Sequence, residues 1–119
     1  ITDFERGIRM LSESLQRIEK EIRENQSISE EQKNELLELV NKLKQEISVL
    51  GETHKEDARS ITRFTEVSLA EAVREARNPE LLKHALEGLS LSVRRFEVSH
   101  PVLIGVINNI GRVLWNIGI

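Results

Sequence analysis

Apolar residues recur along the chain at alternating spacings of three and four, the period of an amphipathic α-helix. Up to about Asn25 this spacing has no gap, through Ile1, Phe4, Ile8, Leu11, Leu15, Ile18 and Ile22. A second series follows a short polar loop at 27–29 and consists of Leu36, Val40, Leu43, Ile47 and Leu50. Both series have heptad spacing. Because the loop is short, residues 1–50 are predicted to form an antiparallel, coiled-coil-like helical hairpin.

The second predicted helix has clear signals at both ends and an apolar face too wide for one neighbour. Ser29, followed three residues later by Gln32, has the form of a capping box at its start. Gly51 supplies a stop at its end. Leu37 and Leu39 flank the main apolar series. We therefore expect this helix to contact more than one other helix.

A third helix is predicted from about 53 to 77, with a thinner apolar stripe. Its members are Ala58, Ile61, Phe64 or Thr65, Leu69, Ala72, Val73 and Ala76. Hydroxyl and β-branched side chains at 60–62 have weak helix propensity, so we expect fraying there. His54 lies in a polar run near the start of this helix and is expected to be solvated.

A sharp boundary separates the third helix from a fourth. Asn78 is the predicted N-cap and Pro79 the first helical residue. The apolar residues of the fourth helix, which ends near Val98, are Leu82, Leu86, Leu89, Val93 and Phe96. Pro101 disfavours helical geometry at His100 and so predicts a bend, with Ser99 or His100 capping the last helix.

The last segment, 101–119, has the most regular apolar face. That face consists of Leu103, Val106, Ile107, Ile110, Val113, Leu114 and Ile117. We expect it to be buried within the chain, since one face of the helix is polar. Gly105, Gly111 and Gly118 indicate either close approach of another helix or tolerance in a helix held by burial.

A second, narrower stripe lies beside the main face of this helix, formed by Ile104, Asn108, Gly111 and Trp115. Tryptophan is enriched among interface anchors, so the stripe is a candidate contact for another subunit or partner. The alternative is a partly exposed Trp115 that packs on a neighbouring helix.

These patterns predict one all-α domain over 1–119, a bundle of about five helices. It comprises the hairpin at 1–50, two further helices within 53–98 and the C-terminal amphipathic helix at 101–119. A chain of 119 residues is long enough to bury a core without disulfides. Aromatic residues make up 3% of the chain, so the predicted core is aliphatic.

The composition excludes several classes of function. Net charge is −3 and the charged residues of both signs are interspersed, so no nucleic-acid partner is expected. No apolar stretch reaches the roughly 18 residues of a membrane-spanning helix. The chain has no cysteine, which excludes disulfides and thiolate metal sites and is typical of a reducing compartment such as the cytoplasm.

Candidate chemistry is limited to one pair of residues. Glu97 and His100 have the Glu-x-x-His spacing of one arm of a di-iron carboxylate site. No second arm exists, because Glu80 and His84 are four residues apart. We therefore expect Glu97 and His100 to brace the turn before the last helix, and we expect no metal, cofactor or catalytic residue. The serines and threonines lie in no nucleophile motif, so the protein is predicted not to be an enzyme.

The C-terminal part of the chain resembles a known family. The segments that carry the resemblance are Arg95-Phe-Glu-Val-Ser-His-Pro-Val-Leu, Val106-Ile-Asn-Asn-Ile and Leu114-Trp-Asn-Ile-Gly-Ile. They are similar to small bacterial helical proteins classed as a domain of unknown function, which end in a Phe-Glu-x-x-His-Pro-x-Leu segment, an amphipathic helix and a Gly-Ile tail. The resemblance implies no activity, but it implies a genuine C-terminus and a structural turn and tail motif at Phe96, Glu97, His100, Pro101, Gly118 and Ile119.

The sequence therefore predicts a cytoplasmic bacterial protein that acts as a protein–protein interaction or oligomerisation module, most simply as a homodimer. The two heptad series and the second stripe of the last helix offer more apolar surface than a small bundle readily buries. The alternative is a peripheral membrane protein that docks its C-terminal helix on lipid. Against it, the polar face of that helix carries Arg112 and no lysine, whereas surface-binding helices usually carry several cations.

Overall fold

The computed structural model describes residues 2–119 apart from the side chains of Phe4 and Ile8, so the predicted apolar contacts of Ile1, Phe4 and Ile8 lie outside the described residues. Its elements are α1 (Asp3–Glu24), α2 (Glu30–Leu50), α3 (Lys55–Ala72), α4 (Pro79–Val93), the 3₁₀ turn η1 (Arg94–Phe96) and α5 (Pro101–Gly118). Residues 2–119 contain no strand. The prediction of an all-α bundle with about five helices is confirmed.

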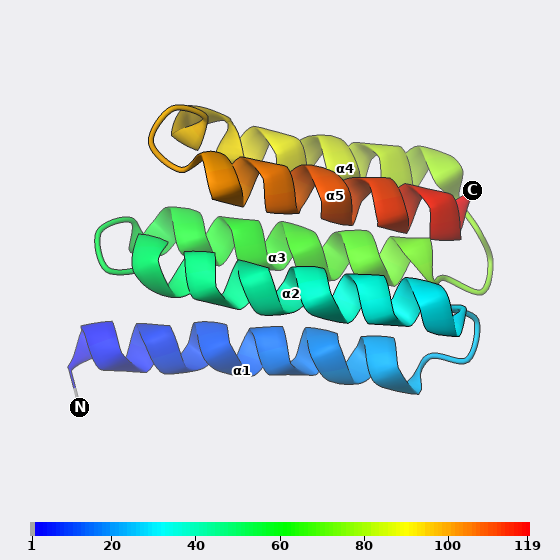
Figure 1. The fold of residues 1–119 in the computed structure, drawn as a ribbon, viewed down its shortest axis with the longest axis horizontal. Helices are drawn as coiled ribbons and strands as arrows, with labels where there is room; N and C mark the ends of the chain where they lie inside the picture. Colours follow the sequence, from blue (N-terminus) through cyan, green and yellow to red (C-terminus); the bar gives the residue numbers. More distant parts are fainter. Residues whose placement is uncertain (1) are drawn as a thin grey trace.

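The five helices lie side by side in three layers (Figure 1). α2 and α3 form the middle layer, α4 and α5 cover one side of it, and α1 lies on the other side. Successive helices alternate in direction, so α1, α3 and α5 run the same way (Figure 1). The antiparallel hairpin of α1 and α2 is present, while its coiled-coil-like packing stays a prediction.

One hydrophobic cluster takes residues from all five helices. Every described member of the predicted apolar faces of α1, α2 and α5 is buried: Leu11, Leu15, Ile18, Ile22, Leu36, Val40, Leu43, Ile47, Leu50, Leu103, Val106, Ile107, Ile110, Val113, Leu114 and Ile117. Leu39 is also buried and Leu37 is half-buried. The wide apolar face of α2 thus serves two layers, since α2 packs against both α1 and α5.

α3 differs from its prediction in length, and it is continuous through residues 60–62. It ends at Ala72 rather than near 77, and Ala76 is exposed. Of the two alternatives for the apolar stripe, Thr65 is the buried residue, whereas Phe64 is 37% exposed. The predicted fraying at 60–62 is wrong: the Thr62 hydroxyl donates to the Ala58 carbonyl at 2.9 Å, and Thr65 makes the equivalent bond to Ile61 at 2.8 Å. These bonds satisfy hydroxyls that would otherwise compete with the helix.

The predicted start signals of α2 and α4 are confirmed. The Ser29 hydroxyl accepts from the Gln32 N–H at 3.2 Å, and the Asn78 side chain accepts from the Leu81 N–H at 3.1 Å. Gly51 is the C-cap of α2, but its φ is −63°, so it ends the helix without the left-handed conformation that glycine permits.

α4 ends earlier than predicted, at Val93, and continues only as the η1 turn. Beyond it, the His100 N–H donates to the Phe96 carbonyl at 2.8 Å. The chain must reverse within these few residues because Pro101 is the first residue of α5 and disfavours a helical His100. His100 is the N-cap of α5, but its ring makes no capping hydrogen bond.

Candidate functional site

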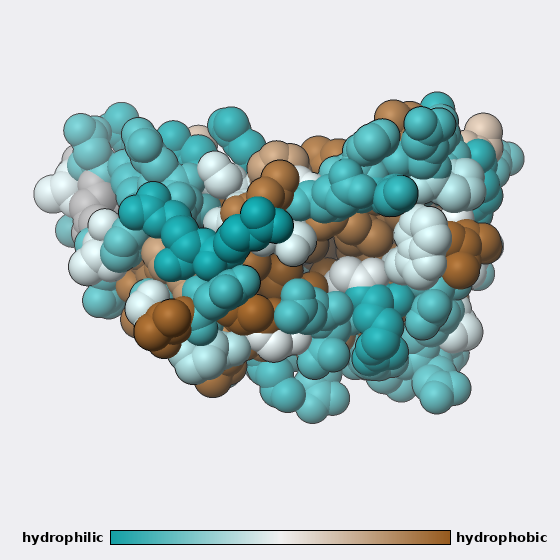
Figure 2. Space-filling model, turned by 90° about the horizontal axis from the view of Figure 1, so that it is seen from above, coloured by the Kyte–Doolittle hydropathy of each residue, from teal (hydrophilic) through white to brown (hydrophobic). Residues whose placement is uncertain are grey.

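The second stripe of the last helix lies beside α4. Ile104, Gly111 and Trp115 are half-buried, and Asn108 is exposed. Beside Trp115 opens a shallow groove of about 430 Å³, whose other lining residues come from α4: Lys83, Leu86, Glu87 and Ser90. Seen from the α4 and α5 side, an apolar strip is hollowed between hydrophilic side chains (Figure 2).

Helical spacing explains why α4 lines this groove. Leu82, Ala85 and Leu89 are buried and fix the inward face of the helix. Leu86 is half-buried at the edge of that face, while Glu87 is exposed on the rim. The groove therefore has an apolar floor, made by Leu86 and Trp115, and charged residues at its edge.

Trp115 packs against the hydrophobic cluster with part of its side chain exposed. That is the arrangement expected for a tryptophan that packs on a neighbouring helix, and it also leaves part of the indole in the groove. The predicted contact of this stripe with a partner stays a prediction.

The three glycines of α5 have different roles. A methyl group on Gly118 would overlap Leu82 Cδ2 and lie 3.1 Å from the Ala72 Cα, so Gly118 permits the close approach of α5 to the end of α3. A methyl group on Gly111 would lie 3.9 Å from Leu86, an ordinary contact, and one on Gly105 would meet no atom of the described residues within 4 Å. Gly105 and Gly111 are thus tolerated in a helix held by burial.

Arg77 joins the same end of α3 to the end of α5. Its guanidinium donates to the carbonyls of Ala72 and Ile117. Carbonyls in the last turn of a helix lack a partner within the helix and carry the negative end of the helix dipole. One cation therefore stabilises two helix ends, and Gly118 lies beside this contact. The tail residue Ile119 is 64% exposed.

The turn motif forms an aromatic cluster at the opposite end of α5. Phe96 is buried, and the rings of His54 and His100 meet it edge to face at centroid distances of 5.2 and 5.4 Å. The prediction that His54 is solvated is therefore wrong, because it is half-buried against Phe96. The ring Nδ1 of His54 lies 2.8 Å from the Thr53 hydroxyl, and that of His100 lies 2.8 Å from the Ser99 hydroxyl.

Glu97 does not brace this turn as predicted. Its side chain is exposed, and among the described residues its carboxylate has no hydrogen bond or ion pair. The η1 turn that buries Phe96 leaves the next residue on the outer side. Within residues 2–119, no three histidine, cysteine, aspartate or glutamate side chains are grouped so that they could hold a metal ion.

The main apolar face of α5 is turned into the core. The exposed residues of α5 include Asn108, Asn109, Arg112 and Asn116. Arg112 forms an ion pair with Glu35 at 2.6 Å. This polar side of α5, rather than its main apolar face, is open to solvent. In the part of the chain that the structure describes, no helix combines the length and the apolar character needed to cross a bilayer.

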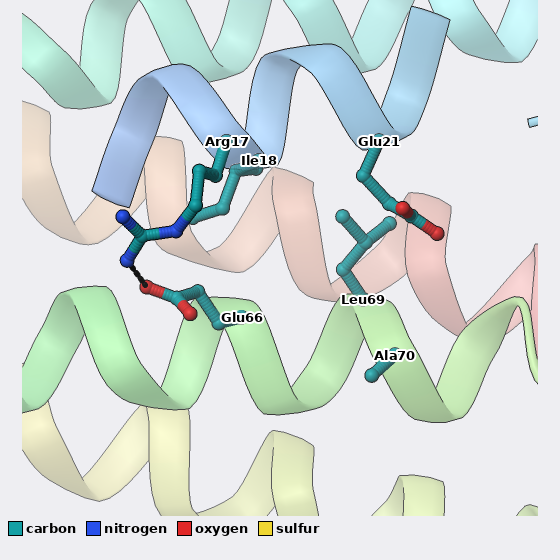
Figure 3. Close-up of a pocket in the computed structure, with 6 residues that line it drawn as sticks. All are labelled: Arg17, Ile18, Glu21, Glu66, Leu69 and Ala70. Carbon is teal, nitrogen blue, oxygen red and sulfur yellow. Dashed lines mark ion pairs between the residues drawn. The ribbon is translucent and has the colours of Figure 1, made fainter. Parts of the chain in front are cut away.

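A second groove, between α1 and α3, has no counterpart in the sequence prediction. One section of it holds about 180 Å³ and is lined by Arg17, Ile18, Glu21, Glu66, Leu69 and Ala70. Arg17 and Glu66 reach across it at 4.0 Å (Figure 3). Arg17 and Glu66 are far apart in the sequence, and only the register of α1 against α3 brings them together.

Residues 41–119, from the middle of α2 onwards, match the model of a family described as a domain of unknown function, DUF4404. The match covers about two thirds of the chain and includes the Phe96 turn and the Gly118 tail. α1 lies outside the matched range. The curated proteins and the solved structures with which the chain was compared include no match.

Proposed function

Since the chain belongs to the DUF4404 family, for which no function is assigned, we propose a function from its surface: a non-enzymatic protein–protein interaction module that forms a homodimer through the α4–α5 groove. We place it in the bacterial cytoplasm, in keeping with a chain that has no cysteine. The observation that carries the proposal is the partly exposed Trp115 in a groove with an apolar floor.

A groove of this kind favours a macromolecular partner. Leu86 and Trp115 leave apolar surface in water, and removing such surface contributes about 25 cal/mol per Å². Tryptophan in a partly desolvated groove surrounded by polar residues has the features of an interface hot spot. The polar residues around Trp115 are those on the rim of the groove: Lys83, Glu87 and Ser90.

The charges on the rim favour a second copy of the chain as the partner. Lys83 and Glu87 lie one helical turn apart, about 6 Å along α4. In a two-fold interface with antiparallel α4 helices, Lys83 of each copy faces Glu87 of the other, so one surface complements itself. Within one copy Lys83 has no carboxylate partner among the described residues, while Glu87 lies 3.5 Å from His84 Nδ1.

Docking of α5 on a membrane, the alternative from the sequence, has no such support. Its apolar face would have to leave a core in which Leu103, Ile110 and Leu114 are no more than 1% exposed. Burial of a single leucine or isoleucine side chain contributes about 1.5–3 kcal/mol, and several would be lost together. We therefore do not propose it.

A charge exchange on the rim tests the dimer without disturbing the core. Lys83→Glu places two carboxylates opposite each other at both ends of the interface, and we expect the dimer dissociation constant to rise at least about tenfold. Lys83→Glu combined with Glu87→Lys restores opposite charges and should recover most of the affinity. Sedimentation velocity across a concentration series measures both. A matched control is Lys42→Glu, on an exposed face of α2 away from the groove.

Removing the two apolar side chains of the second stripe, Ile104 and Trp115, is the second test. Ile104→Asn combined with Trp115→Gln should abolish self-association while the far-ultraviolet circular dichroism stays helical. The exposed pair Val49→Asn and Val67→Gln, 57% and 50% exposed on other faces, is the control and should leave association unchanged. Unaltered self-association of the Ile104 and Trp115 double variant would contradict the proposal.

A further inference from the structure

The groove between α1 and α3 carries a second inference, independent of the proposed dimer. We infer that its arginine-rich section binds a compact phosphate-bearing ligand. This section lies next to the one in Figure 3, shares Arg17 and Glu66 with it, and holds about 360 Å³.

The parallel course of α1 and α3 brings three arginines into this section. Arg17 comes from α1, and Arg59 and Arg63 come from α3. The two α3 arginines are four residues apart, so they lie on one side of the helix about 6 Å apart along its axis. At the start of both helices, Lys55 Nζ donates to the Asp3 carbonyl at 3.0 Å and so fixes this register.

The guanidinium groups are poorly satisfied within the chain. Among residues 2–119, with the side chains of Phe4 and Ile8 set aside, neither Arg59 nor Arg63 has a carboxylate within 4.0 Å. Arg17 reaches Glu66 only at 4.0 Å and its side chain is 64% exposed, which makes a weak surface ion pair. Arg17 also donates to the Ser14 hydroxyl at 2.9 Å, a contact that holds it over the groove.

Phosphate is the anion that this arrangement fits best. A guanidinium presents its donors as a planar fork that matches two phosphate oxygens, and charge-assisted bonds of this kind are stronger than neutral ones. Three arginines against the single carboxylate of Glu66 leave the section with an excess of two positive charges. A ligand oxygen that displaces Glu66 from Arg17 breaks only the weak 4.0 Å pair.

The limits of the basic section favour a compact ligand over a polyanion. The section spans about two helical turns, from Arg59 to Glu66, and the next section adds the carboxylate of Glu21. A nucleic acid strand needs a longer basic track and would meet these carboxylates. Met10, which is 56% exposed, offers an adaptable apolar contact for the organic part of a phosphate ester.

Two sources share this chemistry, a soluble phosphate ester and the phosphomonoester headgroup of a lipid. The first arm of the test titrates inorganic pyrophosphate into the full chain in phosphate-free buffer, by calorimetry and by amide chemical shifts. The second arm measures co-sedimentation with vesicles that contain phosphatidic acid, with and without pyrophosphate as competitor. Saturable pyrophosphate binding without co-sedimentation identifies a soluble ligand. Co-sedimentation that pyrophosphate reverses identifies the lipid headgroup.

Variants that remove the same charge at different places distinguish specific binding in this section from general electrostatic attraction to the protein. Arg59→Gln combined with Arg63→Gln should weaken pyrophosphate binding at least about tenfold, since the charge-assisted bonds of two arginines are lost. Arg23→Gln combined with Arg74→Gln removes the same charge from α1 and from the loop after α3, outside the groove, and should leave binding unchanged.

Three results would overturn the inference. They are the absence of saturable pyrophosphate binding to the unaltered chain, equal loss in both double variants, and shift changes away from residues 10–17 and 59–66. All variants are surface substitutions, and thermal melts followed by circular dichroism confirm that each one is folded.

Discussion

Replacing two glycines of α5 by alanine should change stability in opposite directions. At Gly118 the new methyl group would overlap Leu82 Cδ2, and the Leu82 side chain is fully buried, so it must shift within the core. It would also lie 3.1 Å from the Ala72 Cα, which is backbone and yields little. At Gly105 the same methyl group meets no atom of the described part of the chain within 4 Å and points to solvent.

The magnitudes follow from these surroundings. Overpacking of a core contact costs about 1–3 kcal/mol, and the gain in helix propensity at the last residue of a helix is small. Gly118→Ala should therefore lower the free energy of unfolding by about 1–2 kcal/mol. Gly105 lies inside α5, so Gly105→Ala should raise it by about 0.5–1 kcal/mol.

Urea denaturation followed by helical circular dichroism measures both variants, at one fixed protein concentration so that any association affects them equally. The change is chemically identical and lies in one helix, so propensity alone predicts the same sign for both. A stabilised Gly118→Ala variant, or a destabilised Gly105→Ala variant, would refute the packing described for the two ends of α5.

Three further predictions concern individual side chains. Arg77→Ala removes the donor shared by the Ala72 and Ile117 carbonyls and should lower the free energy of unfolding by about 1–2 kcal/mol in urea; no change would show that water replaces the guanidinium. Ser68→Ala removes a buried hydroxyl that has no hydrogen-bond partner among the described residues, so it should raise the melting temperature; a lower melting temperature would contradict the absence of a partner. Phe96→Ala should cost about 3–5 kcal/mol, while Glu97→Gln on the same turn should stay within about 0.5 kcal/mol, and similar losses would contradict the outward position of Glu97.

The sequence predicts the fold well wherever the signal is local. The apolar face of α5, the heptad series of α2 and the caps at Ser29 and Asn78 all depend on residues within one or two turns, and all of them are present. The number and order of the helices follow from the same periodicity, since each apolar face needs a neighbour.

Two of the misses, the end of α3 and the position of His54, involve contacts that link distant parts of the chain. α3 stops at Ala72, where Arg77 and Gly118 meet it, and Gly118 lies 46 residues further along. His54 looks solvated in its polar surroundings, but its ring lies on Phe96 from another turn. No periodicity within one segment contains this information.

The candidate surfaces show the same division. The Trp115 stripe can be predicted from the sequence because its members recur on one helix, whereas the α4 residues beside it cannot. The arginines of the α1–α3 groove lie on two helices, and their proximity depends on the parallel register of α1 and α3. The spacing of four residues between Arg59 and Arg63 is the one feature of the sequence that points to this arginine-rich section.

The most direct test of the proposed dimer is the molar mass of the unaltered chain in solution, measured by light scattering across a concentration series. The proposal predicts a mass that approaches twice the 13.7 kDa of one chain as the concentration rises. It also predicts that the fluorescence of Trp115, the single tryptophan, shifts to shorter wavelength in parallel. A mass that stays at 13.7 kDa up to millimolar concentration would contradict the homodimer.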